Sequence, residues 1–423
     1  MLDPKFIRQN PEVIREALKK RASDFDLDAF LILDQTHRDL NQQLEELYAV
    51  QNRINKEVKQ LLKDKKPPAE KIQESKEIKK EIEGIKSKFK GLTGDWDKQT
   101  FEIPNIPHAS LPIGDISCNK IVKEEGEFKK FDFKPLDHIT LAEHLDIIDF
   151  KTAAKLIGSN FALFKGEGAR LERALINFML DLHIKEHGYK EISPPLLANR
   201  VSMTTTGQLP KFEEDMYHLK DEDYFLIPTA EVPITNLHQG EILEQEELPI
   251  AYVSYTSCFR REAGSYGKET KGLVRLHQFD KVELVKFVLP ENSYQELENL
   301  LSNACRVIEL LEIPYRIVLL ATGDISFAAA KCYDIEIYAS GLDKWLEVSS
   351  CSNFENFQAR RGNIRYREKD TKKLKYVHTL NGSGVALARL VICILENYQN
   401  RDGSVTIPEV LRSYMDGKTR IEK

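Results

Sequence analysis

The chain has 423 residues, of which 41% are hydrophobic, enough for two or three domains and at least one large core. Lys and Arg number 61 and Asp and Glu number 67, giving a net charge of −6, so the overall composition does not indicate a nucleic-acid-binding protein and any RNA site must be local. No apolar run approaches a membrane span and the first residues lack a signal-peptide core, so we expect a cytoplasmic protein without a membrane partner.

Two segments with a heptad pattern predict a long antiparallel coiled-coil arm. The first seam is formed by Leu33, Leu40, Leu44, Leu47, Ile54, Val58 and Leu61. After Pro67 and Pro68, which cannot continue a helix, a second seam is formed by Ile78, Ile82, Ile85, Phe89 and Leu92. About 30 residues in each leg would make an arm of roughly 45 Å. His37 and Gln51 occupy seam positions, where polar residues lower stability but help to fix the register.

Basic charge gathers on this predicted arm. Residues 51 to 92 contain 13 Lys and Arg but 7 Asp and Glu, although the whole chain is acidic. Taken alone, this pattern favours the solvated surface of a coiled coil. The alternative is a rod that lies along an RNA backbone, because contact with phosphates is electrostatic and needs no sequence readout.

A stretch containing Pro and Gly after the arm predicts a linker between two domains. We therefore expect an N-terminal helical domain at residues 1–105, with the arm at about 30–93. The linker is expected at residues 106–127 and a second domain at residues 128–423.

The second domain mixes helical and strand patterns. Helices are predicted at Gly168–Glu186, Ser293–Leu311 and Ala386–Asn397. Strands are predicted at Leu226–Ile227, Ala251–Val253, Leu273–Phe279, Val282–Phe287 and Tyr315–Leu320. Because the strands run in blocks, we expect an α+β fold with an antiparallel sheet flanked by helices, rather than a doubly wound sheet. The six cysteines lack CxxC spacing, which indicates buried thiols and not a disulfide framework or a zinc ribbon.

The densest polar stretch runs from Cys258 to Glu283. Two predicted strands flank a polar loop that contains Gly264, Gly267 and Gly272. Such a hairpin supplies the parts of a nucleotide site, because the Arg fork can grip a phosphate and an aromatic ring can stack on a base. From the residue types alone, a merely charged hairpin is an equally good interpretation.

This stretch resembles motif 2 of class II aminoacyl-tRNA synthetases, in the form found in seryl-tRNA synthetases. Gly188–Leu197 resembles motif 1, and Leu380–Gln399 resembles motif 3. Thr229–Asn236 and Glu347–Phe354 resemble segments that narrow the class to serine. On these five matches in order, the chain is identified as a member of the bacterial-type seryl-tRNA synthetases.

The resemblance implies a reaction in two steps. Serine is activated with ATP to seryl-adenylate and then transferred to the 3′-terminal adenosine of serine tRNA, with selenocysteine tRNA as a further candidate acceptor. Arg260 is the expected catalytic residue, bridging the ATP α-phosphate and the serine carboxylate. The expected ATP-binding residues are Arg260, Arg261, Glu262, Arg275, Leu276, Phe279, Glu347, Val348, Ser349, Ser350 and Arg389. Glu347 and Ser350 are also expected to hold Mg²⁺ with ATP.

The resemblance also implies the sites for the other partners. The expected serine-binding residues are Thr229, Ala230, Glu231, Arg260, Glu283, Asn381 and Ser383. The expected tRNA-binding residues are Lys63, Lys65, Lys66, Lys71, Lys79, Lys80, Lys268 and Lys271. A homodimer is expected from motif 1, with the arm of one subunit serving the active site of the other. No DNA partner is expected.

Two departures from the family pattern and two alternative functions accompany this interpretation. Lys271 stands where relatives commonly carry Arg, which keeps the charge but loses the fork, and Ala388 stands where Gly is usual. One alternative is an amino acid ligase that charges a carrier other than tRNA, which would have less need of a long basic arm. The other is a non-catalytic RNA-binding paralogue. Four residues argue against it: Arg260, Glu283, Glu347 and Arg389.

Overall fold

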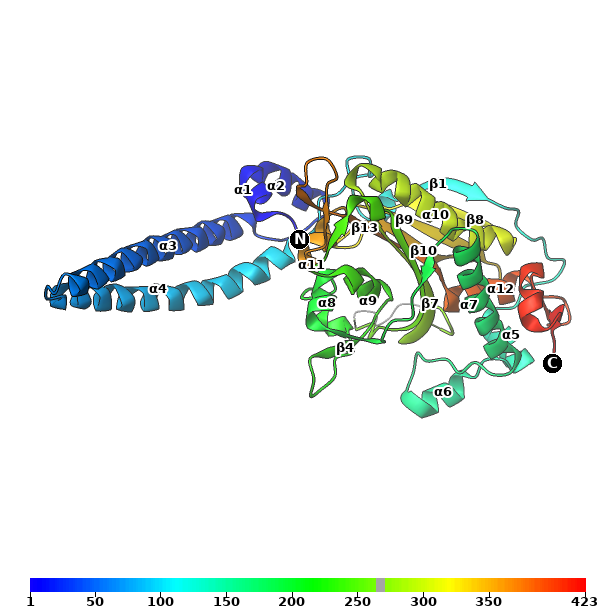
Figure 1. The fold of residues 1–423 in the computed structure, drawn as a ribbon. Coiled ribbons are helices and arrows are strands. Elements are labelled where there is room, and N and C mark those ends of the chain that lie inside the picture. The colour runs from blue at the N-terminus through cyan, green and yellow to red at the C-terminus, as the bar shows by residue number, and fades with distance from the viewer. Residues whose placement is uncertain (264–270) are drawn as a thin grey trace. The chain divides into compact units, whose positions relative to one another are not determined.

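A computed structural model describes residues 1–263 and 271–423, in two compact units (Figure 1). One unit holds residues 2–19 and 23–104, and the other holds Met1, residues 20–22 and residues 105–423. All six cysteines are free thiols and five of them are buried, as expected. Among the described residues, no helix combines the length and the apolar character needed to cross a bilayer.

The first unit is helical. Its helices are α1 (Pro4–Gln9), α2 (Pro11–Lys20), α3 (Leu27–Lys63) and α4 (Ala69–Glu102). The Asp26 side chain begins α3 by accepting the backbone N–H of Ala29 at 2.9 Å, which satisfies one of the free donors at the helix start. At 37 and 34 residues, α3 and α4 are each about 50–55 Å long and pack side by side, which confirms the predicted coiled-coil arm.

Polar layers inside the arm fix its register. The His37 ring is stacked between Phe89 and Trp96, with ring centroids 4.7 and 4.8 Å away. The Gln51 side-chain amide donates to the Ser75 hydroxyl at 2.6 Å. Because a shift of one helix along the other would break both layers, the two polar seam positions select one pairing of the helices.

The second unit is built on a sheet, which has eight strands among the described residues, in the order β1-β8-β9-β10-β13-β7-β6-β2. All neighbours are antiparallel except β2 and β6, so the predicted antiparallel architecture is confirmed. The strands of this sheet are β1 (Lys120–Glu125), β2 (Lys190–Glu191), β6 (Ile250–Phe259), β7 (Gln278–Val288), β8 (Tyr315–Leu319), β9 (Lys331–Ala339), β10 (Lys344–Asn353) and β13 (His378–Ala386). The smaller sheets contain β3 (Leu197–Asn199), β4 (Tyr224–Leu226), β5 (Ile242–Glu244), β11 (Arg365–Arg367), β12 (Leu374–Tyr376), β14 (Val405–Thr406) and β15 (Arg420–Ile421).

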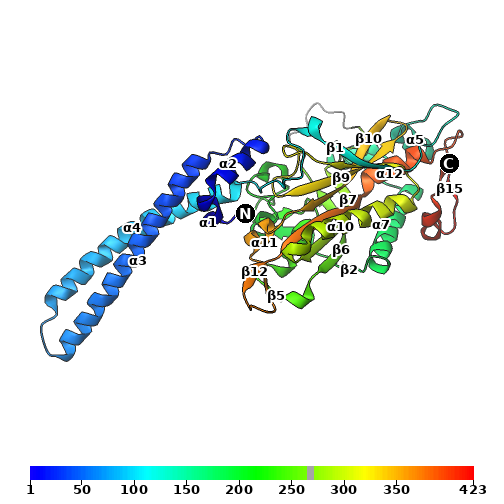
Figure 2. The same ribbon diagram turned by 90° about the horizontal axis from the view of Figure 1, so that it is seen from above.

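Helices cover this sheet and close the core (Figure 2). Those that pack on its strands are α7 (Glu167–Lys185), α9 (Glu231–Thr235), α10 (Ser293–Leu310), α11 (Phe357–Gly362) and α12 (Leu387–Asn397). The unit also contains α5 (His138–Leu145), α6 (Phe150–Ile157) and α8 (Arg200–Thr205). The largest apolar cluster joins buried side chains of α7, α10 and α12 to those of the central strands. In β13, Gly382 lies against Leu300 of α10, where an added methyl group would approach to 2.2 Å. This close approach sets how near α10 lies to the strand that carries part of the site.

Three central strands, β9, β10 and β13, were not predicted, and two predicted segments have a different structure. The predicted strand at Leu273–Phe279 is wrong for its first five residues, because β7 begins only at Gln278. Leu273 donates its backbone N–H to His138 Nε2 at 3.2 Å, and the carbonyl of Val274 accepts from Arg389 at 3.3 Å. These side-chain partners replace the backbone pairing of a strand. In addition, β1 lies within the segment expected as a linker and forms the edge of the sheet beside β8.

Candidate active site

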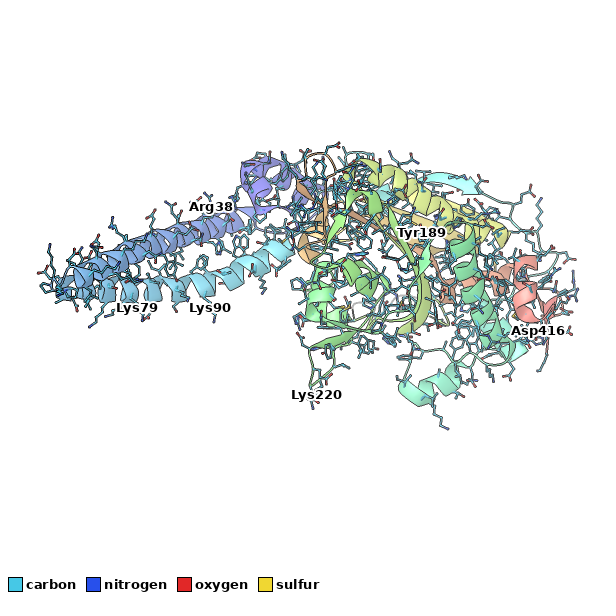
Figure 3. The ribbon with its side chains drawn as sticks, in the orientation of Figure 1. Arg38, Lys79, Lys90, Tyr189, Lys220 and Asp416 are labelled. Carbon is cyan, nitrogen blue, oxygen red and sulfur yellow. The ribbon has the colours of Figure 1, made fainter. Side chains whose placement is uncertain are left out.

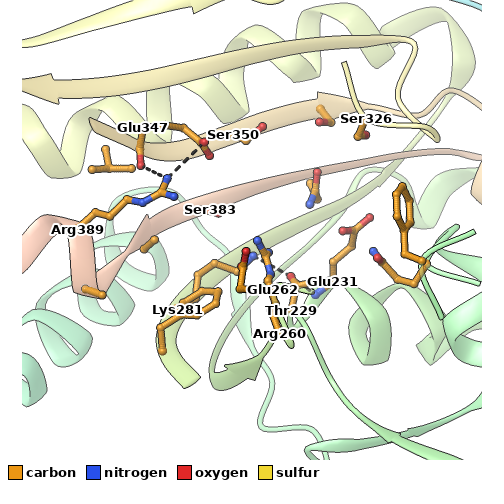
Figure 4. A pocket seen from close by; sticks show the side chains of 18 of the residues that line it. Thr229, Glu231, Arg260, Glu262, Lys281, Ser326, Glu347, Ser350, Ser383 and Arg389 are labelled. Carbon is orange, nitrogen blue, oxygen red and sulfur yellow. Dashed lines mark hydrogen bonds and ion pairs between the residues drawn. The ribbon is translucent and has the colours of Figure 1, made fainter. Parts of the chain in front are cut away.

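A cavity of about 420 Å³ opens on the face of the sheet formed by β6, β7, β10 and β13 (Figure 4). It brings together most of the residues predicted for ATP and serine. Those lining it are Thr229, Glu231, Arg260, Glu262, Arg275, Leu276, Phe279, Glu347, Val348, Ser350, Asn381, Ser383 and Arg389. In Figure 4, Glu347, Ser350 and Arg389 lie on one side of the cavity, and Arg260, Glu262, Thr229 and Glu231 lie on the other.

The alternation of strand side chains explains part of this grouping. In β7, Phe279, Lys281 and Glu283 are two residues apart and point to the same face. Asn381 and Ser383 do the same in β13. On the other face of β7, Val282 and Leu284 belong to the apolar core, whereas Asp280 accepts from the Tyr255 and Ser257 hydroxyls. The burial of Val282 and Leu284 in the core turns Lys281 and Glu283 to the opposite face.

Two β-bulges complete the grouping. A register shift between Glu347 and Ser349 in β10 puts an extra residue into the strand, so Glu347 and Ser350, three residues apart, both line the cavity. A second register shift lies between Ser383 and Val385 in β13, so Ser383 and Ala386 also both line the cavity. A regular strand would turn one member of each pair toward the core.

Arg260 lies at the end of β6 with an exposed side chain, available to a ligand. Its backbone N–H donates to the carbonyl of His277 at 2.9 Å, its Nε donates to the carbonyl of Pro228 at 3.3 Å, and its guanidinium lies 5.2 Å from the centre of the Phe279 ring. Nearby, Arg275 forms an ion pair with Glu262 at 3.0 Å. Within residues 1–263 and 271–423 Arg260 forms no ion pair, so the site holds a positioned guanidinium beside an aromatic face.

Arg389 and Glu347 form the opposite wall. Arg389 Nη1 donates to the Glu347 carbonyl at 2.6 Å and lies 3.3 Å from its carboxylate. Next to them, the Ser350 hydroxyl contacts Cys332 Sγ at 3.1 Å. This wall offers a carboxylate oxygen and a hydroxyl oxygen on one strand face, next to a cation.

The inner end of the cavity is a buried polar network. The Thr229 hydroxyl donates to Glu283 at 3.2 Å, and the Asn381 amide donates to the other oxygen of Glu283 at 3.0 Å. Glu231 accepts from the Gln358 amide at 2.6 Å. Burial, and then the charge of Glu283, raise the pKa of Glu231 to about 7. Two carboxylates held close together in a dry site suit a small cationic ligand.

Four residues predicted for ATP or serine do not line this cavity, and neither does Lys271, which was predicted for tRNA. Ala230 is fully buried in an apolar cluster, and the Ser349 hydroxyl donates to the Ser383 carbonyl at 2.5 Å. Arg261 is exposed and donates its backbone N–H to the Asp215 carbonyl at 3.0 Å. Glu283 is buried just behind the wall, in contact with Thr229 and Asn381. Lys271 is exposed outside the lining.

Lys268 lies outside the described residues. The other lysines predicted for tRNA belong to the helical unit and are exposed, apart from Lys71, which is half-buried and paired with Glu57 at 3.0 Å and Glu74 at 2.8 Å. Figure 3 shows Lys79 and Lys90 along α4, with side chains directed away from α3. The return leg of the arm therefore presents positive charge to solvent.

Sequence reasoning missed Lys281 and Gln358. Lys281 lines the cavity and is paired with Glu283. Its position two residues before Glu283, directly before the predicted strand Val282–Phe287, was a usable signal, because residues two apart on a strand share a face. Gln358 lies in α11, far along the chain from Glu231, and no local pattern links the two.

The chain is similar to proteins of one family. A model described as the seryl-tRNA synthetase N-terminal domain matches residues 1–107, and one described as the tRNA synthetase class II core domain (G, H, P, S and T) matches residues 211–398. The serine–tRNA ligase of Geotalea uraniireducens is 53% identical over 422 residues, covering 100% of both chains.

Two solved structures agree along the chain. Seryl-tRNA synthetase from Pyrococcus horikoshii, complexed with ATP, has a TM-score of 0.91 and 38% identity, covering 100% of this chain and 99% of that one. Cytoplasmic serine–tRNA ligase from Naegleria fowleri, in complex with AMP, has a TM-score of 0.86 and 29% identity, with the same coverage. The chain belongs to the seryl-tRNA synthetase family of class II aminoacyl-tRNA synthetases.

Proposed function

We propose that this chain is a serine–tRNA ligase, which activates serine with ATP and transfers it to the 3′-terminal adenosine of serine tRNA. The observation that carries the proposal is the 53% identity to a serine–tRNA ligase over the full length of both chains. The test is ATP–pyrophosphate exchange with each standard amino acid. Serine should support the fastest exchange, and faster exchange with another amino acid would show that the substrate is wrong.

In the first step, a serine carboxylate oxygen attacks the α-phosphorus of ATP and pyrophosphate leaves. Arg260 contacts the α-phosphate and the serine carboxylate, and its charge offsets the negative charge that they bring together. Phe279 stacks on the adenine ring and Glu262 accepts from it. Arg275 and Arg389 contact the terminal phosphates or cover the second adenine face. In the second step, the tRNA hydroxyl attacks the serine carbonyl carbon and AMP leaves.

Glu347 and Ser350 would hold Mg²⁺ together with ATP. The donor chemistry supports this assignment, because the bulge in β10 presents a carboxylate and a hydroxyl oxygen side by side, and Mg²⁺ is usually held by one or two carboxylates plus phosphate oxygens. The ion, when bound, would neutralise charge on the phosphates of ATP. Glu347 is available for this contact because nearly half of its side chain, 45%, is exposed.

Glu231 binds the serine ammonium in this proposal, which gives a pH prediction. With a pKa of about 7, Glu231 becomes neutral as the pH falls below neutrality and loses its attraction for a cation. The KM for serine should therefore rise, approaching about tenfold per pH unit well below pH 7, while the KM for ATP changes little. Exchange kinetics between pH 5.5 and 8 check this.

The variant Glu231→Gln serves as the matched control. It keeps the shape of the side chain and a partner for Gln358 but cannot ionise. Its serine KM should be high and nearly independent of pH over the same range. A pH-dependent serine KM of wild-type size in this variant would assign the titration to another group.

The arm binds tRNA through its lysines in this proposal. Lys63, Lys65, Lys66, Lys79 and Lys80 are exposed, and within the part of the chain that the structure describes they form no ion pairs. Unneutralised exposed cations suit contact with a phosphate backbone, which releases bound counterions. Residues 1–105 would be the tRNA-binding domain and residues 128–423 the catalytic domain, joined by residues 106–127.

A homodimer is the proposed assembly, with the arm of one subunit serving the partner's active site. Next to motif 1, a surface hollow of about 380 Å³ is lined by Pro195, Leu197, Tyr224 and Leu237, among others. Leu197, Tyr224 and Leu237 are each more than 40% exposed, which is unusual for clustered apolar side chains on a monomer. Sedimentation should give a dimer for the wild type and a monomer for Leu197→Asp; a dimeric variant would contradict this surface. The site of action is proposed to be the cytoplasm.

A further inference from the structure

Lys281 is a buried cation within the serine end of the cavity. It lines the cavity wall from β7 and is only 5% exposed. Its Nζ donates to the Thr229 hydroxyl at 2.8 Å and forms a close ion pair with Glu283. Burying an ammonium group is costly unless it is paired, so this placement needs a reason.

The hydrogen bonds of Thr229 show what Lys281 does to its neighbours. The Thr229 hydroxyl oxygen accepts from Lys281 and from the backbone N–H of Glu231 at 3.2 Å. Both acceptor positions of the hydroxyl are then in use, so its single proton is directed to Glu283 at 3.2 Å. The Thr229 hydroxyl is therefore committed to orienting Glu283.

As a result, Glu283 and Glu231 differ in how many of their carboxylate acceptor positions are occupied. Glu283 accepts from Thr229 and Asn381 and is paired with Lys281. Glu231 accepts from Gln358 through one oxygen, and its other oxygen has no partner within residues 1–263 and 271–423. A substrate ammonium at Glu283 would meet the like charge of Lys281, whereas at Glu231 it meets an open carboxylate oxygen.

We propose that Lys281 is a positioning residue that determines specificity, because it reserves Glu283 for the neutral serine hydroxyl and leaves Glu231 to bind the ammonium. The inference rests on the proposed function and deepens it. Glu283 lies just behind the cavity wall and is held by three neighbours. Its Oε1 accepts from Asn381 and has a second acceptor position, which would take the hydroxyl proton. Alanine lacks that proton, so it leaves a buried acceptor unmatched, which is how a hydroxyl-reading site rejects such an analogue.

The test compares serine with alanine in pyrophosphate exchange. In Lys281→Met, the ratio of kcat/KM for serine to that for alanine should fall by at least about tenfold, because the hydroxyl-reading carboxylate is no longer held. The KM for ATP should stay near the wild-type value. If the substitution only disturbed packing, kcat/KM for serine and kcat/KM for alanine would fall together, and their ratio would not change.

Lys286→Met is the matched control. Lys286 lies on the same strand, is 7% exposed and is paired with a glutamate, Glu296, at 2.8 Å, but it lies outside the cavity. This variant should keep the wild-type ratio of serine to alanine even if its melting temperature falls. A drop in the ratio as large as that of Lys281→Met would overturn the assignment to Lys281.

If Lys281→Met does not fold, Lys281→Gln carries the same test, because glutamine keeps a donor for Thr229 but removes the charge. Its ratio of kcat/KM for serine to that for alanine should also fall. A folded Lys281→Gln protein with the wild-type ratio would overturn the inference. Exchange by the wild-type protein distinguishes a failure of the proposed function from a failure of the role proposed for Lys281. If the wild type does not prefer serine, the proposed function fails; if it does and the variants keep its ratio, only the role of Lys281 fails.

Discussion

Replacing Arg260 with alanine should abolish formation of seryl-adenylate while the protein stays folded. Arg260 is the exposed cation at the centre of the cavity, and its side chain makes one hydrogen bond, to the Pro228 carbonyl, with protein groups that the structure describes. Removing a charge positioned for the transition state costs about 10²- to 10³-fold in rate for a single donor and more for a phosphoryl-transfer arginine. We expect a loss of at least about 10³-fold in serine-dependent pyrophosphate exchange.

Two further variants serve as controls for Arg260→Ala. Arg260→Lys keeps a charge but loses the fork that could hold two oxygens, so it should recover only a small part of the activity. Arg316→Ala removes an arginine that also lies over an aromatic ring of the sheet, 4.4 Å from the centre of Trp345, but outside the cavity. Arg316→Ala should keep exchange within about twofold of the wild type, because Arg316 is paired with Glu336 and does not line the cavity. Exchange by Arg260→Ala at a comparable rate would refute the role of Arg260.

Removing the outer part of the arm should separate the two steps of the reaction. Every residue that lines the cavity lies between Thr206 and Arg389, so deletion of residues 35–90 leaves the cavity lining intact. The deletion also keeps Asp34 and Trp96, whose hydrogen bond of 2.9 Å ties the bases of α3 and α4 together. Pyrophosphate exchange should stay within a few-fold of the wild type. In contrast, tRNA charging should fall by about 10³-fold or more, because many cations that we propose to contact phosphate groups are removed together.

A charge variant of the full-length arm tests the same contact without shortening the chain. Glutamine at Lys63, Lys65, Lys66, Lys79 and Lys80 removes five exposed charges that are unpaired among the described residues and leaves the apolar seam in place. Charging should weaken, and its dependence on salt concentration should become shallower in proportion to the number of phosphate groups that the variant no longer neutralises. If the deletion reduces exchange and charging equally, the separation between arm and catalytic domain is wrong.

Much of the fold could be predicted because it depends on periodic patterns. The heptads fixed the arm, and its polar positions His37 and Gln51 have partners in the opposing helix. The β6–β7 hairpin follows from two apolar runs around a polar loop. The run from Leu273 to His277 was predicted as a strand because three of its residues are apolar. Its backbone is instead bound by the His138 and Arg389 side chains, and such distant partners leave no local signal.

Only part of the candidate active site could be predicted from the sequence. The residue types were recognisable through resemblance, but the bulges that bring Glu347 and Ser350 to one face are backbone irregularities without a sequence signature in this chain. The pairing of Glu231 with Gln358 joins residues far apart in the sequence. Such pairs depend on the packing of α11 against the sheet, which local propensity does not encode.

Charging of purified serine tRNA tests the central claim most directly. The wild-type protein, given ATP, Mg²⁺, labelled serine and unlabelled competitors, should form a serine ester at the 3′-terminal adenosine and release AMP. Nuclease digestion and mass spectrometry of the terminal adenosine identify the ester. A protein that performs serine-dependent exchange but leaves serine tRNA uncharged would contradict the account.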